Sequence, residues 1–450
     1  MKRIFIILVL CTLMGLTKTM AQEAYAVYTS DNTTLTFYYD NQKSSRSGIK
    51  YSVPLNQTDD DDPAWFSKVG ETTTVKFDPS FAGARPTNTN SWFSAMYKLT
   101  TITGMEYFNT SQVTSMSYMF SLSRNLRSLD LTHFNTAKVK KMVRMFWGCE
   151  KLVTICVGDG WTTNAITNSE EMFTGCHELV GGNGTKYDDM HPLHSRAHID
   201  GKDGYAGYFT SAEYTSLTYN LWVGGIQVTY MNKDDILNTG QAAYNPSTNT
   251  LTLKGQYING KGTSSDAATG CGAGIYSQVN GLTIDVVSGT KVTGANGCSG
   301  MLLINNTTIT GSAQLTASGD MGVHLGSTSS NLTVSGNVTL EADGTTGGIT
   351  GYRRTRPFEN YYSTLTVKDQ ATVKAYGLGT LADLVLENHA ITYPTDAVWN
   401  ADQNAVCGAT GKPITGKWVW IEYQEPPRAD VNQDGTVDSA DIVAVIKAMK

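Results

Sequence analysis

The segment ADVNQDGTVDSADIVAVIKAMK, residues 429–450, carries oxygen ligands at the spacing of a calcium-binding loop. In a twelve-residue loop of the EF-hand type the ligands stand at positions 1, 3, 5, 7, 9 and 12, with glycine at position 6. Counting from Asp430 places Gly435 at position 6. The ligands are then Asp430, Asn432, Asp434, Thr436 through its backbone carbonyl, Asp438 directly or through water, and Asp441. Hard oxygen ligands suit Ca²⁺, so the sequence predicts a calcium site.

A helix is expected after this loop but not before it. Pro426 and Pro427 prevent an incoming helix. The exiting helix has an apolar stripe formed by Ile442, Val445, Ile446 and Met449. A calcium loop with one helix resembles one half of a type I dockerin, a module that normally contains two halves. The resemblance implies docking to a cohesin-like protein, with Ser439 and Ala440 as the recognition pair. The single half fits a truncated sequence, a second half supplied by a partner, or a relic.

A second group with binding chemistry is the segment YRRTRPFENYY, residues 352–362. Arginine binds anionic groups in bidentate fashion and stacks on rings, and tyrosine stacks on sugars. The candidate glycan-binding residues are Tyr352, Arg353, Arg354 and Arg356. The alternative interpretation is an exposed turn with incidental basic residues.

No catalytic constellation stands out in the sequence. The sets considered are the histidines His191, His194 and His198, and the carboxylates Asp320, Glu341 and Asp343. Pro192 favours an exposed loop around the histidines over a metal site. The carboxylates are scattered over separate predicted strands and form no clear acid–base pair. We therefore predict that the protein is not an enzyme.

The glycan candidates interrupt a ladder of repeated strands in the second half of the sequence. Apolar residues recur at Ile284, Ile309, Val334 and Val367, with spacings of 25, 25 and 33. A second marker, glycine followed by an apolar residue, begins at Gly274, Gly300, Gly322, Gly348 and Gly377. Two interleaved ladders predict a right-handed β-solenoid with parallel strands and glycines at its corners. Cys271 and Cys298 fall on adjacent rungs, where a disulfide and simple stacking both remain open. The region is similar to β-helical modules found beside dockerins, some of them described as carbohydrate-binding.

The first half of the sequence contains a different repeat. Residues 107–131 are followed by residues 133–157 with seven apolar positions recurring 26 positions later, and a third copy follows at an offset of 27. Val113, Met116, Met119 and Phe120 have helical spacing and predict a short helix whose apolar side chains form core. The LxxLxL pattern from Leu126 to Leu131 predicts a strand. These motifs resemble the BspA-type leucine-rich repeats over residues 25–212, which implies a surface or secreted adhesion domain without catalysis.

The amino terminus predicts export. A basic start is followed by an apolar stretch from Ile4 to Leu16 and by small residues before Gln22, which is typical of a signal peptide. The localisation expected is secreted or extracellular, with attachment to the cell surface an option, and no later segment reads as a membrane span. A formal net charge of −6 argues against nucleic-acid partners.

The predicted fold is mostly β with short helices: a leucine-rich-repeat solenoid, a right-handed β-solenoid and a dockerin-like loop–helix. The expected segments are 1–21, the signal peptide; 22–212, the leucine-rich repeats; 213–424, the β-helical domain; and 425–450, the calcium-binding tail. The expected function is an adhesin-like interaction protein with Ca²⁺ in its tail, docked to a cohesin-like partner. Its solenoids would bind a host or cell-surface protein, or a polysaccharide. The alternative is a glycan-binding or glycan-cleaving component of a polysaccharide-degrading assembly.

Overall fold

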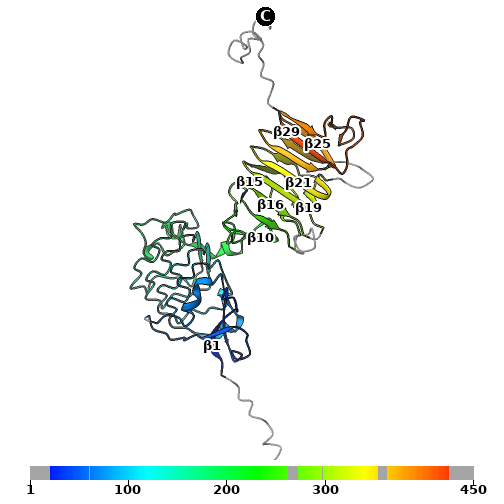
Figure 1. Cartoon of the computed structure of the whole chain (residues 1–450). Helices are drawn as coiled ribbons and strands as arrows, with labels where there is room; N and C mark the ends of the chain where they lie inside the picture. Colours follow the sequence, from blue (N-terminus) through cyan, green and yellow to red (C-terminus); the bar gives the residue numbers. More distant parts are fainter. Residues whose placement is uncertain (1–20, 60, 262–271, 296, 353–361, 425–450) are drawn as a thin grey trace, which may run out of the picture. The chain divides into compact units, whose positions relative to one another are not determined.

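A computed structural model describes residues 21–59, 61–261, 272–295, 297–352 and 362–424 (Figure 1). Strands make up 39% and helices 7% of the structure, which confirms the mostly β prediction. The chain divides into unit 1, Met1–Ser216, and unit 2, Leu217–Lys450. The predicted boundary at residues 212 and 213 lies close to this division. Within the described residues, none of the helices has the length and apolarity needed to cross a membrane.

The strands and 3₁₀ helices of unit 1 are short. The strands are β1 (Glu23–Tyr28), β2 (Thr34–Asp40), β3 (Ile49–Ser52), β4 (Thr74–Phe77), β5 (Thr101–Thr103), β6 (Ser128–Leu131), β7 (Thr154–Val157) and β8 (Thr210–Ser211). The 3₁₀ helices are η1 (Phe66–Glu71), η2 (Pro79–Gly83), η3 (Met105–Tyr107), η4 (His194–Arg196), η5 (Lys202–Gly204) and η6 (Ala212–Ser216). Strands β1 to β5 form one sheet in the order β3-β1-β2-β4-β5, and β6, β7 and β8 form a second, parallel sheet.

The helix predicted from the Met/Phe spacing is wrong. Alternate backbone N–H groups donate to the next repeat instead: Met116 to Lys141 at 2.9 Å, Tyr118 to Val143 at 2.8 Å, Phe120 to Met145 at 2.9 Å and Leu122 to Trp147 at 2.7 Å. An α-helix would need those N–H groups for its own carbonyls. The intervening bonds are local, as from Met119 N–H to the Met116 carbonyl at 3.3 Å. Each repeat is therefore a run of tight turns, which we call a rung.

Successive rungs repeat the same backbone conformation. A positive φ recurs at two positions of each rung, first at Ser91, Tyr118, Arg144 and Glu171, and then at Ala95, Leu122, Gly148 and Gly175. Glycine adopts this conformation without the strain that a Cβ adds. At Gly148 a Cβ would also come within 2.9 Å of a Leu122 methyl carbon. Both requirements explain glycine at this position.

The rung side chains that point inward form the core of unit 1, as predicted. Val113, Met116, Met119 and Phe120 are fully buried. Side chains at one further position of each rung hydrogen-bond to the preceding rung. Ser123 donates to the carbonyl of Phe93 at 2.9 Å, Cys149 to that of Phe120 at 3.1 Å and Cys176 to that of Phe146 at 3.0 Å. Burial raises the pKa of the Cys149 thiol to about 12, which keeps it protonated and unreactive.

The segment before the first rung covers that end of the stack. Gln57 Nε2 donates to the carbonyl of Asn90 at 2.9 Å, and the buried Trp65 indole N–H donates to the carbonyl of Trp92 at 2.9 Å. In later rungs, carbonyls at these positions accept from the preceding rung. Because a buried carbonyl without a partner is costly, these side chains replace the missing rung.

Unit 2 contains the remaining strands. They are β9 (Thr218–Val223), β10 (Ile226–Thr229), β11 (Ala242–Asn245), β12 (Thr250–Lys254), β13 (Tyr257–Asn259), β14 (Ile275–Ser277), β15 (Leu282–Ser288), β16 (Thr290–Thr293), β17 (Met301–Leu303), β18 (Thr307–Gly311), β19 (Gln314–Leu325), β20 (Leu332–Val334), β21 (Thr339–Thr350), β22 (Ser363–Val367), β23 (Thr372–Tyr376), β24 (Leu378–Gly379), β25 (Leu381–Leu386), β26 (His389–Tyr393), β27 (Val398–Asn400), β28 (Ala405–Cys407) and β29 (Trp418–Tyr423).

Most neighbouring strands of unit 2 are parallel and come from successive turns of the chain (Figure 1). One ladder runs β12-β15-β18-β20-β22-β25 and aligns Ile284, Ile309, Val334 and Val367 as direct partners. Another aligns Ile275, Met301, Val323, Ile349 and Leu378, each of which follows a marker glycine. A third runs β13-β16-β19-β21-β23. The residues named for the first two ladders are buried, so they form the core of unit 2.

Antiparallel strands cover one end of each parallel ladder. β9 pairs antiparallel with β14, and β11 does the same with β12. At the other end β29 pairs antiparallel with β23 and with β26. An open parallel edge would expose unpaired backbone groups to other chains, and these strands occupy one such edge of each ladder.

Candidate functional site

The third ladder of unit 2 positions a set of outward-facing side chains, some exposed and the others half-buried. Along β16, Thr290 and Val292 are buried whereas Lys291 is exposed, and the neighbouring strands show the same alternation. Successive side chains of a strand point to opposite faces of the sheet. The inward residues, among them Ile258 and Val292, pack in the core. The outward residues are therefore held by a fixed backbone on the surface of the sheet.

Residues that are direct partners in register form a single line across this surface. We call it the outer row; it consists of Tyr257, Lys291, Thr316, Glu341, Lys374 and Trp420. Neighbouring strands lie about 4.8 Å apart, so the five steps of the row span about 24 Å. The row is long enough to contact an extended chain along its length.

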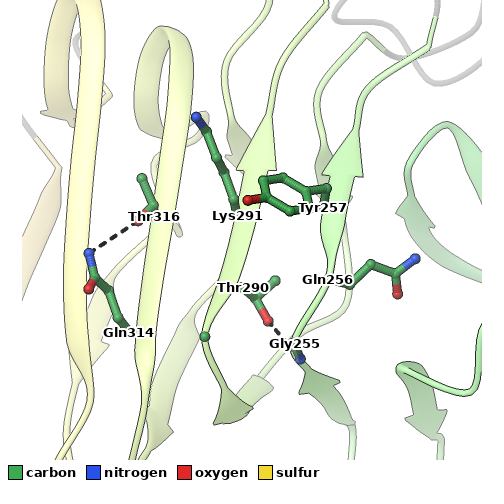
Figure 2. Close-up of a pocket in the computed structure, with 8 residues that line it drawn as sticks. Gly255, Gln256, Tyr257, Thr290, Lys291, Gln314 and Thr316 are labelled. Carbon is green, nitrogen blue, oxygen red and sulfur yellow. Dashed lines mark hydrogen bonds between the residues drawn. The ribbon is translucent and has the colours of Figure 1, made fainter.

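A hollow of about 320 Å³ lies at the Tyr257 end of the outer row (Figure 2). Its lining includes Tyr257, Lys291, Gln314 and Thr316. Tyr257 is 77% exposed, a large fraction for an aromatic side chain. Gln314 Nε2 donates to Thr316 Oγ1 at 3.3 Å and to a Glu341 carboxylate oxygen at 3.0 Å. Gln314 thus links two side chains of the outer row beside the hollow.

The other end of the outer row is aromatic as well. The rings of Trp420 and Tyr393 lie with centroids 5.1 Å apart, and the ammonium group of Lys374 lies 4.7 Å from the Trp420 ring centroid. A second aromatic pair lies two positions further along the same strands, where the ring centroids of Tyr376 and Trp418 are 5.9 Å apart. Aromatic rings therefore stand at both ends of a line of polar side chains.

Unit 1 has two surface rows built by its rungs, the first half-buried and the second exposed. One row is Tyr118, Arg144 and Glu171, and the other is Tyr97, Arg124 and Glu150; we call them the Tyr–Arg–Glu rows. The pairs Arg144–Glu171 and Arg124–Glu150 are ion pairs at 2.5 and 3.3 Å. Hydrogen bonding to Glu171 raises the pKa of Arg144, which stays charged. Arg124 also lies over the ring of Tyr97, which is 42% exposed.

Most of the site residues predicted from the sequence fall outside the described residues. This holds for the calcium ligands Asp430, Asn432, Asp434, Thr436, Asp438 and Asp441, for the recognition pair Ser439 and Ala440, and for Arg353, Arg354 and Arg356. Tyr352 is described. Its backbone N–H donates to Ser363 Oγ at 3.0 Å, and its ring centroid lies 6.2 Å from that of Tyr362. The glycan hypothesis for this segment therefore stays a prediction.

The three histidines make separate local contacts. His194 Nδ1 is 2.6 Å from Ser169 Oγ, His191 Nδ1 is 2.8 Å from an Asp188 oxygen, and His198 Nδ1 is 3.1 Å from the Ile199 carbonyl. Across the parts of the chain that the structure describes, no three His, Cys, Asp or Glu side chains gather where they could hold a metal.

The chain as a whole is mostly β, and in each unit successive turns of the chain stack on one another. Residues 80–184 match the family described as "Mycoplasma protein of unknown function, DUF285". That family is associated with BspA-like repeat surface proteins. The match covers the rungs of unit 1 that carry the Tyr–Arg–Glu rows, and it covers less than half of the chain. No curated protein and no solved structure matches the chain.

Proposed function

We propose that this chain is a secreted or cell-surface interaction protein, adhesin-like and without catalytic activity, that binds a protein through unit 1. The observation that carries the proposal is the pair of Tyr–Arg–Glu rows on the surface of unit 1, one exposed and one half-buried. Tyrosine and arginine are over-represented among the residues that dominate protein–protein binding energy. The ion pairs with Glu150 and Glu171 restrict the side chains of Arg124 and Arg144, so less conformational entropy is lost on binding.

The finer architecture belongs to the same proposal. Unit 1 is a leucine-rich-repeat-type solenoid, unit 2 is a right-handed β-solenoid, and residues 425–450 form a dockerin-like tail. The hydrogen bonds between rungs and the parallel ladders support the two solenoids. The match of residues 80–184 to a family associated with repeat surface proteins supports a place outside the cell. Stacked repeats suit this role because they hold long rows of side chains on a rigid scaffold.

Replacing Arg124 and Arg144 together with alanine should weaken binding to cells at least about tenfold, because both rows lose their central residue. The measurement is flow cytometry with fluorescently labelled residues 22–450, on cells with and without prior protease treatment. Protease treatment should abolish the binding of the unchanged protein.

The control removes two exposed positive charges of unit 1 away from the rows, Lys68→Ala with Lys202→Ala. This variant should bind as the unchanged protein does. Binding that survives protease treatment, or that falls equally in both variants, would refute recognition of a protein by the rows.

The tail should bind Ca²⁺ and attach the protein to a cohesin-like partner. Asp434→Ala removes the ligand at position 5 and should weaken Ca²⁺ binding at least about tenfold in isothermal titration calorimetry. The matched control is Asp402→Ala, an exposed aspartate outside the tail. Capture of a cohesin domain should need Ca²⁺ and should be lost in Asp434→Ala. Equal Ca²⁺ affinity in Asp434→Ala and the unchanged chain would contradict the loop assignment.

A further inference from the structure

We propose that the outer row of unit 2 binds a linear polysaccharide whose sugar units carry carboxylates, lying across the strands from the hollow at Tyr257 to Trp420. This inference goes beyond the protein-binding role of unit 1 because it uses other residues and another class of ligand. It also differs from the glycan hypothesis for residues 352–362, since none of its residues belongs to that segment.

The first argument is the repeat of the row. Its side chains project once per strand, about 4.8 Å apart, along a direction fixed by the ladder. This repeat is similar to the length of one sugar unit in an extended chain. A folded protein partner would not be expected to match a regular straight line of single side chains. An extended polymer meets each position in turn.

The second argument is the chemistry of the two ends. Tyr257 at one end is largely exposed, and Trp420 at the other packs against Tyr393 with an angle of 38° between the ring planes. The apolar face of a sugar ring packs on an aromatic face, and this contact orients the sugar without a pocket that encloses it. Two aromatic contacts at a distance of about 24 Å hold a polymer at both ends of the row.

The third argument concerns the charge beside the hollow. Lys291 is exposed, and no ion pair joins it to another described residue. By contrast, Lys374 lies over the Trp420 ring. Figure 2 shows Lys291 and Tyr257 projecting from neighbouring strands beside the hollow. An ammonium group next to an exposed aromatic ring suits a sugar that carries a carboxylate, because one sugar can contact both.

The fourth argument is that the polar residues between the ends are already ordered. Gln314 bridges Thr316 and Glu341 by the two hydrogen bonds described above. These hydrogen bonds restrict the rotamers of the three side chains, so less conformational entropy is lost on binding. The buried alternate residues of the same strands keep the backbone rigid beneath them.

The test is affinity electrophoresis of residues 22–450 in native gels containing polygalacturonate, hydroxyethyl cellulose or polyglutamate. We expect retardation by polygalacturonate alone. Tyr257→Ala and Lys291→Ala should each weaken this binding at least about tenfold, since each removes a main contact at the hollow. Both side chains are exposed, so these variants should fold normally.

Matched controls are Tyr205→Ala, a tyrosine that is 70% exposed in unit 1, and Lys254→Ala, an exposed lysine at the end of β12. Both should bind polygalacturonate unchanged. No retardation by polygalacturonate would overturn the inference, and so would equal retardation by polyglutamate, which would indicate charge alone. Equal retardation by hydroxyethyl cellulose would overturn the role of the carboxylate. None of these results bears on the cell-binding test of unit 1, so the two proposals fail separately.

Discussion

Replacing Phe146 with alanine should lower the free energy of unfolding of unit 1 by about 4 kcal/mol. Phe146 is fully buried and lies between Phe120 and Phe173, with ring centroids 5.7 and 5.5 Å away. Both pairs are stacked, with interplanar angles of 5° and 11°. Alanine would remove the contact to both neighbouring rungs at once. The rungs are held by backbone hydrogen bonds on either side, so the cavity cannot close easily.

Hydrogen exchange read by mass spectrometry measures this loss in the full chain, because each peptide reports the unit it comes from. Exchange should accelerate in peptides of residues 88–180 and stay unchanged in peptides of unit 2, whose core is a separate cluster. Tyr97→Ala, at a side chain that is 42% exposed, should cost less than about 1 kcal/mol. Equal effects of the two substitutions would contradict an aromatic stack that holds the rungs together.

The sequence predicted which residues of unit 1 are buried but not the backbone that buries them. Spacing at Val113, Met116, Met119 and Phe120 correctly indicated one apolar face, and a helix is the usual structure with that face. A run of tight turns places the same residues inward. The backbone hydrogen bonds from Met116 and the equivalent residues to the next rung favour the tight turns over the helix. These bonds join residues far apart in the sequence, so the local spacing does not reveal them. A recurring glycine, as at Gly148 and Gly175, was the available signal for a positive φ.

The outer row of unit 2 could have been found from the sequence. Lys291, Thr316, Glu341 and Lys374 each lie seven positions after the apolar markers Ile284, Ile309, Val334 and Val367. They therefore share the spacings of 25, 25 and 33, and an alignment of the rungs places them at one position. Trp420 could not be found in this way, because β29 is antiparallel to β23 and leaves the repeat. Its place in the row depends on how the end of the ladder is covered.

Asp200 should control the acid stability of unit 1. This residue is 6% exposed, and its side chain joins parts of the segment that follows the last rung. One carboxylate oxygen accepts from the backbone N–H groups of Asn183 and Thr185 at 2.9 and 3.0 Å, and the other from the Thr185 hydroxyl and the Gly207 N–H at 2.7 and 3.1 Å. Burial acts to raise the pKa of Asp200, but these hydrogen bonds outweigh it and hold the pKa below its ordinary value.

A carboxyl group whose pKa is lowered by folding stabilises the folded state at every pH above its unfolded pKa, about 3.9 for aspartate. That stabilisation is lost as the pH falls through the lower, folded pKa. In the Asp200→Asn variant an amide NH₂ group would face backbone donors, so unit 1 should lose about 2 kcal/mol at pH 7. Because the variant no longer binds this proton, the difference between the two proteins should shrink as the pH falls below about 4. Urea unfolding from pH 7 to pH 2.5 measures this difference in the free energy of unfolding. The control is Asp159→Asn, at an exposed aspartate. A difference that stays constant with pH would mean that Asp200 contributes through packing and not through its charge.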